Sequence, residues 1–233
     1  MTLTRSVRVS HPEELDAALA DLGVRCGRPV LAVVGGASGL GPDDLAAVTG
    51  LLRFLVPALE VWGAAVVDGG TDSGVMRALG EVREATAATF PLIGVAAAGT
   101  VVLPGTDGAA DGVALDPRHT HAVLVPGDEW GDEAWWLAAV ATAVAGASPS
   151  ATLVLNGGAI TFADAEHSLA VDRPVVVVSG SGRTADAIAV ASAGGPADER
   201  AGRIAGSPRT RVVALDDPEG AVAALRDILA AGP

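Results

Sequence analysis

Four short segments rich in glycine carry the residues best suited to hold a phosphate group. Each follows an apolar run, and they are Gly35-Gly36, Gly69-Gly70, Gly157-Gly158 and Gly180-Ser181-Gly182. Glycine lets the backbone turn tightly and approach a ligand, because no Cβ atom intervenes. A helix that begins just beyond such a turn directs N–H groups and the positive end of its dipole at the ligand. The alternative is that these glycines only form tight turns, which explains one pair more easily than four.

Polar residues beside these glycines extend the candidate site. Arg183 stands at an expected helix start, where a cation is unfavourable unless an anion is bound. We therefore expect Arg183 to contact a phosphate, with a surface salt bridge as the alternative. Thr71 and Ser73 either offer hydroxyl groups to a phosphate or cap the following helix. Asp68 either accepts hydrogen bonds from a ribose or caps its own turn.

His119 and His121 are candidates for contact with a ribose or a carboxylate, with a structural role as the alternative. They alternate at the start of an expected strand, so they face opposite sides and cannot both bind one metal ion from a regular strand. The acidic segment 128–133 surrounds Trp130. It predicts either an acidic metal or sugar site or, as we favour, a solvated helix start. No cluster of Cys and His residues indicates zinc, and we expect no metal.

Two familiar nucleotide motifs are absent from the sequence. The pattern GxxxxGK[ST] does not occur, which argues against ordinary ATP hydrolysis. The first glycine segment, GGASGLG, does not reproduce GxGxxG with an acidic residue about 20 positions later, which argues against ordinary dehydrogenase chemistry.

The elements that must position these residues follow the pattern of βαβ units, with short β-branched runs alternating with Ala- and Leu-rich stretches. We expect one domain over residues 1–233, an α/β fold of Rossmann type with a doubly wound, mostly parallel sheet of about seven strands. The glycine segments then meet at the carboxyl edge of the sheet. We expect a loop over 103–116 and a mobile loop over 194–210. The expected strands lie in 29–36, 64–70, 91–99, 119–126, 151–158, 174–182 and the stretch from residue 211.

Composition excludes several classes of protein. Hydrophobic residues make up 50% of the 233 residues, too many for a disordered chain. The net charge is −13 and all 15 basic residues are Arg without a basic tract, so we expect neither nucleic acid nor a membrane as a partner. No apolar run reaches the roughly 20 residues of a spanning helix, and the N-terminal segment does not resemble a signal peptide. With Cys26 as the single cysteine, we expect a cytoplasmic protein.

Several segments in this order resemble the SLOG superfamily, in the version found at the N-terminus of TRPM-family cation channels and in free-standing prokaryotic relatives. These segments are GGASG (35–39), VVDGGTDSGVM (66–76), LDPRHTHAVLV (115–125), GDE (131–133), LVLNGGAIT (153–161) and PVVVVSGSGRTADAIA (174–189). The resemblance implies a nucleotide-derived ligand such as ADP-ribose or a cyclic relative, no obligatory cofactor, a homodimer and an effector still to be identified. The candidate ligand-binding residues are Gly35, Gly36, Ala37, Gly69, Gly70, Thr71, Gly74, Val75, His119, Asn156, Gly157, Gly158, Gly180, Ser181, Gly182 and Arg183.

The same superfamily includes the cytokinin-activating LOG enzymes, which cleave nucleoside 5′-monophosphates at the N-glycosidic bond. Their pattern PGGxGTxxE, or more fully GGxGTLEE, matches residues 156–164 here. Asn156 replaces the proline, Ile160 the third glycine and Ala163 the first acidic residue, while Asp164 occupies the second acidic position. The lost carboxylate argues against hydrolysis, so we assign no catalytic residue.

Three hypotheses stay open at this point. The first is a sensor that binds an ADP-ribose-like nucleotide without changing it. The second is a LOG-like phosphoribohydrolase or other nucleotide glycohydrolase, in which Asp164 or Glu166 would have to act. The third is an oligomerisation domain that has lost its ligand.

Overall fold

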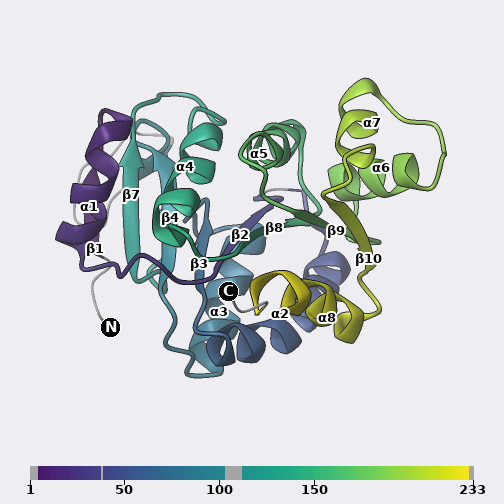
Figure 1. Cartoon of the computed structure of the whole chain (residues 1–233), viewed down its shortest axis with the longest axis horizontal. Helices are drawn as coiled ribbons and strands as arrows, with labels where there is room; N and C mark the ends of the chain where they lie inside the picture. Colours follow the sequence, from purple (N-terminus) through teal and green to yellow (C-terminus); the bar gives the residue numbers. More distant parts are fainter. Residues whose placement is uncertain (1–4, 38, 103–111, 231–233) are drawn as a thin grey trace.

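The computed structural model describes residues 5–37, 39–102 and 112–230. Its centre is an eight-stranded, all-parallel sheet with the strand order β1-β7-β4-β3-β2-β8-β9-β10 (Figure 1). These strands are β1 (Arg5–Arg8), β2 (Val30–Gly35), β3 (Ala65–Asp68), β4 (Leu92–Ala97), β7 (His121–Val125), β8 (Ser150–Leu155), β9 (Val175–Ser179) and β10 (Thr210–Ala214). Two short strands, β5 (Val101–Val102) and β6 (Val113–Ala114), pair with each other outside this sheet.

Helices cover both faces of the sheet, as Figure 1 shows. The helices on one face are η1 (Pro12–Glu14), α1 (Leu15–Leu22), α4 (Ala134–Ala145), α5 (Ala159–Ala170), α6 (Arg183–Ser192) and α7 (Glu199–Ala205). Those on the other face are α2 (Pro42–Val61), α3 (Gly74–Ala85) and α8 (Pro218–Leu229). The expected Rossmann-like, doubly wound fold is confirmed.

The central strands are apolar on both sides because both of their faces are covered. In β2, Val30, Ala32 and Val34 pack into the core beneath α1, α4 and α5. The alternate residues Leu31 and Val33 pack into the core beneath α2, α3 and α8. The continuous Val-rich runs of the sequence therefore supply two cores, one on each side of the sheet.

The order of the strands reverses at β2, and this reversal places the site. From β2 the chain proceeds through β3, β4 and β7 in one direction, and then returns so that β8 pairs with the other side of β2. A crevice therefore opens at the carboxyl ends of β2 and β8, which is where open α/β sheets bind ligands. Three of the four glycine segments meet around it.

Two elements differ from the sequence expectation. The edge strand β1 was not expected, because its RSVR sequence contains two charged residues and no apolar run; it pairs with β7 from Arg5 to Arg8. The stretch 194–210, expected as a mobile loop, contains the helix α7 instead. Asp198 caps the start of that helix by accepting a hydrogen bond from the Ala201 N–H. Ala201 and Ile204 are the buried residues on the inner face of the helix. Within the expected loop over 103–116, residues 103–111 lie outside the described part of the chain.

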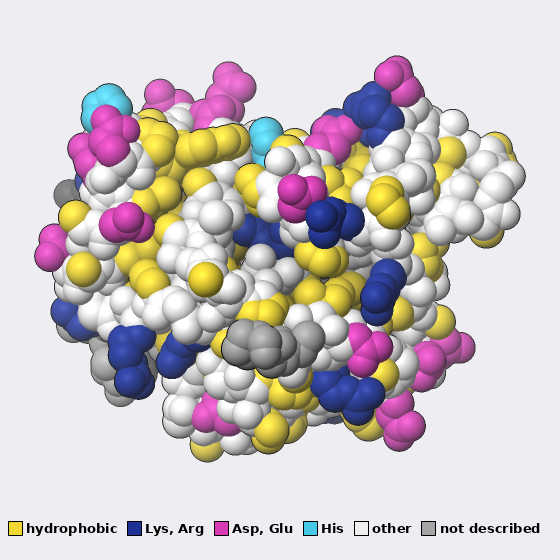
Figure 2. All heavy atoms as spheres, in the orientation of Figure 1, with side chains coloured by type: hydrophobic (Ala, Val, Ile, Leu, Met, Phe, Trp, Pro, Cys, Tyr) yellow, Lys and Arg dark blue, Asp and Glu magenta, His cyan; other side chains and the backbone are white. Residues whose placement is uncertain are grey.

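No helix in the described part of the chain is long and apolar enough to cross a membrane. On the face shown in Figure 2, acidic side chains lie mostly around the periphery and basic ones are scattered, without a continuous basic surface.

Candidate ligand-binding site

A cavity of about 550 Å³ lies at the reversal point of the sheet. It opens at the carboxyl ends of β2, β3 and β4 and at the N-termini of α3 and α5, and α6 contributes Arg183. The lining residues are Val33, Val34, Gly35, Gly36, Ala37, Gly69, Thr71, Ser73, Met76, Ala96, Val113, Trp130, Glu133, Leu137, Gly158, Ala159, Ile160, Thr161, Asp164 and Arg183.

Glycine is required where the loops that form this cavity touch one another. A Cβ atom on Gly35 would overlap the carbonyl oxygen of Leu155 on the neighbouring strand β8. A Cβ atom on Gly74, whose φ is +50°, would overlap the carbonyl oxygen of Gly36. Val75 N–H donates to that same Gly36 oxygen at 3.1 Å. The glycines therefore bring the end of β2 into backbone contact with both β8 and the start of α3.

Asn156 fastens the loop after β8 to the loop after β9. Its backbone N–H donates to Ser181 Oγ at 2.8 Å, and its Nδ2 donates to the Ser181 carbonyl oxygen at 2.7 Å. Its Oδ1 accepts from Gly157 N–H at 2.7 Å, and its φ of +58° is one that asparagine tolerates. Both ends of the amide are thus engaged within the protein, and Asn156 positions the glycine loops rather than lining the cavity.

Arg183 lies at the mouth of the cavity as the first residue of α6, with a left-handed φ of +49°. Its guanidinium lies against two loops. One of its nitrogens would be 3.0 Å from a Cβ atom added to Gly39, and another would be 3.0 Å from a Cβ atom added to Gly158. The N-terminus of α5 begins just after Gly158, so a cation and a positive helix end face the same space. This arrangement favours an anion there.

Thr71 and Ser73 place two hydroxyl groups in the wall of the cavity. Their oxygens lie 3.1 Å apart, and Thr71 is 2% exposed. Ser73 occupies the position before α3, but its side chain makes no capping hydrogen bond. The Ser73 hydroxyl therefore lies beside the cavity and makes no hydrogen bond to the backbone N–H groups at the start of α3.

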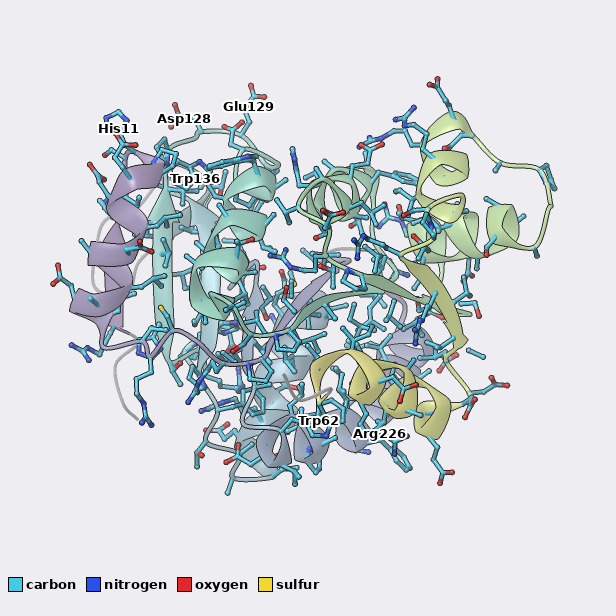
Figure 3. All side chains as sticks on the ribbon, in the orientation of Figure 1. His11, Trp62, Asp128, Glu129, Trp136 and Arg226 are labelled. Atoms are coloured by element: carbon cyan, nitrogen blue, oxygen red, sulfur yellow. The ribbon has the colours of Figure 1, made fainter. Side chains whose placement is uncertain are left out.

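The acidic segment before α4 divides into three parts. Asp128 and Glu129 point away from the protein in the loop after β7 (Figure 3). Asp132 Oδ2 accepts from the N–H groups of Asp128 and Glu129, at 3.0 and 3.1 Å, and so closes that loop. Glu133 turns toward the cavity, as does Trp130, which is 47% exposed. Our interpretation as a solvated helix start fits Asp128 and Glu129 but not Glu133.

Asp164 gives the cavity an acidic inner wall. It lies on the buried stripe of α5 with Thr161, Ala165 and Ser168, and it is 8% exposed. Burial and, to a smaller extent, the charge of Glu133 raise the pKa of the Asp164 carboxyl to about 8. Burial likewise raises the pKa of Glu133, although the N–H of Gly131 donates to its carboxylate at 2.9 Å. One end of the cavity is therefore cationic and the other holds two carboxyl groups.

His119 belongs to a buried ionic cluster behind the cavity and does not line it. Its ring nitrogens lie 2.7 Å from Asp68 Oδ1 and 3.1 Å from Asp116 Oδ2. Burial alone would lower its pKa, but the charge of Asp68 and hydrogen bonds to Asp116 and Asp68 raise it to about 9. Asp116 also binds Arg118 at 2.7 Å. The cluster links the end of β3 to the segment that leads into β7, which is a structural role.

The structure brings seven of the sixteen candidate residues to the cavity surface, and the other nine do not line it. Those at the surface are Gly35, Gly36, Ala37, Gly69, Thr71, Gly158 and Arg183. Those that do not line it are Gly70, Gly74, Val75, His119, Asn156, Gly157, Gly180, Ser181 and Gly182.

Sequence reasoning missed the acidic and apolar end of the cavity. Trp130 and Glu133 come from the turn before α4, Met76 from α3 and Ile160 from the first turn of α5. The available signal was that Asp164 falls on the same helical stripe as Thr161, Ala165 and Ser168, which would direct a carboxyl group at the sheet.

Two further features of the described chain concern metal binding and a second cavity. In the described ranges, no three or more His, Cys, Asp or Glu side chains are grouped so that they could hold a metal ion. A smaller cavity of about 300 Å³ opens at the amino edge of the sheet, where Arg25, Arg28 and His121 line it.

Comparison with known proteins agrees with this architecture. Among solved structures, the molybdenum cofactor carrier protein of Chlamydomonas reinhardtii has 19% identity and a TM-score of 0.56, covering 87% of this chain and 99% of its own. The molybdenum cofactor binding protein of the phototrophic bacterium Rippkaea orientalis has 13% identity and a TM-score of 0.56, covering 86% of this chain and 96% of its own. No curated protein sequence matches significantly. The model of the family described as SLOG in TRPM, prokaryote, matches residues 28–224. The chain therefore belongs to the prokaryotic SLOG-in-TRPM family.

Proposed function

We propose that this chain binds a nucleotide-derived ligand, such as ADP-ribose or a cyclic relative, at the cavity that opens at the carboxyl ends of β2, β3 and β4. The observation that carries the proposal is that Arg183 lies beside the N-terminus of α5, in the wall of a cavity of about 550 Å³ that the start of α3 also lines. Backbone N–H groups at helix starts and a guanidinium are the groups that hold phosphates in proteins.

The rest of the cavity suits the remainder of a nucleotide. Thr71 and Ser73 offer hydroxyl groups, and Met76, Leu137 and Ile160 provide an apolar wall. Trp130 offers an aromatic face on which a base can stack. Asp164 lies six residues beyond Gly158, about 9 Å along α5 at 1.5 Å per residue. This span suits a nucleoside phosphate better than a bare phosphate ion.

The two proteins of similar fold are named for binding or carrying the molybdenum cofactor. That likeness supports a small-molecule site on this fold and leaves the ligand of this chain to be determined by experiment.

A thermal-shift screen with AMP, ADP, ADP-ribose, cyclic ADP-ribose and NAD tests the proposal. A ligand present at 100 times its Kd stabilises by about 2.7 kcal/mol, which corresponds to a rise in Tm of about 5–10 °C for a chain of this length. Arg183→Ala should weaken binding by about tenfold or more, because charge-assisted hydrogen bonds contribute about 1.5–3 kcal/mol. Arg211→Ala, on the exposed surface of the edge strand β10, is the matched control and should bind normally. No shift with any of these compounds would refute the proposal.

One observation favours a second function, hydrolysis of the N-glycosidic bond of a nucleoside 5′-monophosphate. Asp164 lines the cavity, whereas Glu166 is held by Arg200 at 3.1 Å and Arg203 at 2.7 Å and does not line it. With a pKa of about 8, Asp164 carries a proton at neutral pH and can give it to the departing base as the N-glycosidic bond breaks; the carboxylate so formed then takes the proton that water loses when its oxygen bonds to the ribose carbon. Chromatography of each mixture distinguishes the two functions, since a released free base would make this chain an enzyme and intact nucleotide would not.

A further inference from the structure

The smaller cavity, of about 300 Å³, opens at the amino edge of the sheet, whereas the proposed nucleotide site opens at the carboxyl edge. Its walls come from the segment between α1 and β2, the end of α2 with the turn after it, the connection from α3 to β4, and the first residue of β7. The ionisable residues in its wall are Arg25, Arg28, Glu60 and His121. His121, a candidate ligand residue in the sequence, therefore lines this cavity and not the nucleotide site.

Glu60 brings a carboxylate to this wall, and the chain itself already engages both of its oxygens. Oε2 accepts from the backbone N–H groups of Thr89 and Phe90, at 2.8 and 3.0 Å. Oε1 accepts from the Thr89 hydroxyl at 2.5 Å. Glu60 therefore fastens the connection after α3 to the end of α2, and its oxygens are not the partners of the arginines in the wall.

The arginines in and around the cavity are of two kinds. Arg5 Nη2 donates at 3.3 Å to a carbonyl oxygen in the last turn of α1, and Arg83 Nε donates at 2.9 Å to the Phe90 carbonyl oxygen. Cations are favourable there, because the negative ends of the helix dipoles lie at this edge of the sheet. Within residues 5–37, 39–102 and 112–230, Arg25 and Arg28 instead make no hydrogen bond or ion pair. The helix ends do not account for these two side chains.

The electrostatic environment of this cavity is positive, although the net charge of the chain is −13. Burial lowers the pKa of the His121 ring, and the charges of Arg5 and Arg83 lower it further, against a hydrogen bond with the Leu22 backbone. Both of these charges therefore reach the wall in which the two unbonded guanidinium groups lie. Like charges that share a small cavity repel one another, and a bound anion offsets that repulsion.

We propose that the amino-edge cavity is a second ligand site, in which the guanidinium groups of Arg25 and Arg28 hold phosphate or a small phosphate monoester. The planar fork of N–H donors on a guanidinium group matches two oxygens of a phosphate. With about 300 Å³, against about 550 Å³ at the other edge, the cavity suits a small ester and not ADP-ribose. The inference goes beyond the proposed function and does not depend on it, because the two sites share no residue.

A ¹H–¹⁵N NMR titration of the full chain with sodium phosphate at pH 7.5 tests this inference. A parallel titration with sodium chloride at equal ionic strength is the control for general screening. Phosphate should shift the amide signals of Gly23, Arg25 and Gly63 saturably, with a Kd of about 1–10 mM, and chloride should not. The amide signals of Gly36 and Gly158 report the nucleotide site in the same spectra.

Four variants separate this site from general charge and from the nucleotide site. Arg25→Gln and Arg28→Gln should each raise the Kd for phosphate about tenfold, because each removes one charged donor group. Arg211→Gln, on the exposed surface of the edge strand β10, changes the net charge equally and should keep the wild-type Kd. Arg183→Ala removes the cation of the nucleotide site, and the amino-edge signals should still saturate as in the wild type.

Three results would overturn the second site. One is the absence of saturable shifts at the amino edge, with or without shifts around Gly158. Another is an equal response of the amino-edge signals to phosphate and chloride. The third is a Kd that Arg211→Gln raises as much as Arg28→Gln, since general charge would then explain the binding. The proposed nucleotide function stands or falls separately, because the signals at the carboxyl edge and the thermal-shift screen report it.

Discussion

Replacing Asn156 by alanine tests whether this residue organises the site or touches the ligand. In the structure its Nδ2 and Oδ1 bond to the Ser181 carbonyl and the Gly157 N–H, and the residue is 2% exposed. Asn156→Ala removes both bonds and leaves two buried partners unpaired, at about 1–2 kcal/mol each. Alanine at a φ of +58° adds about 1 kcal/mol.

The expected destabilisation is therefore about 3–5 kcal/mol. Urea unfolding of the wild type and the variant measures it, with the midpoint expected to fall and the m-value to stay constant. Asn156→Gly is the matched comparison, because glycine loses the same hydrogen bonds but adopts the left-handed conformation without strain. It should be more stable than Asn156→Ala by about 0.5–1 kcal/mol.

A different pattern would refute this reasoning. If Asn156→Ala unfolds within about 1 kcal/mol of the wild type but no longer binds nucleotide, Asn156 contacts the ligand directly.

Three further predictions concern stability. The pKa of His119 is raised to about 9, so the protonated ring contributes about 3 kcal/mol to the free energy of unfolding below pH 6.5. This contribution is lost as the pH rises from 6.5 through 9. The stability difference between the wild type and His119→Gln, measured by urea unfolding, should therefore shrink over that range. The raised pKa of Asp164 likewise means that stability is lost as the pH rises from about 4 to 8, so Asp164→Asn should be more stable than the wild type at pH 7.5 by about 1–3 kcal/mol, and a less stable variant would contradict the burial argument. Gly74→Ala should lower stability by at least about 2 kcal/mol through overlap with the Gly36 carbonyl, whereas Gly50→Ala in α2, where a Cβ meets nothing within 4 Å, should stabilise by about 0.5–1 kcal/mol; equal effects in thermal unfolding would refute the close contact.

The fold was largely predictable from the sequence because its signals are local. Val30–Gly35 is apolar and ends in glycine, and the four valines of Val175–Ser179 are followed by Ser179 and Gly180, which identifies buried parallel strands and their turns. β1 was missed because its RSVR sequence gains its place only by pairing with β7, a tertiary contact. α7 was missed because Gly and Pro dominate the surrounding composition, although Asp198 supplied a helix-start signal.

The site was predictable at its phosphate end and not at its acidic end. Arg183 and the glycine pairs are adjacent in sequence to the turns that display them, so a local pattern suffices. Glu133 and Asp164 are 31 positions apart and meet only because α4 and α5 pack side by side on the sheet. Asn156 was placed in the ligand set because it occurs inside a motif, whereas its bonds to Ser181 depend on the loop after β9.

A crystal structure of the protein with ADP-ribose tests the central claim most directly. The account predicts a phosphate group at hydrogen-bonding distance from Arg183 and from the first N–H groups of α5, with the adenine ring against Trp130. ADP-ribose bound elsewhere, for example in the smaller cavity beside Arg25 and Arg28 at the amino edge of the sheet, would contradict it.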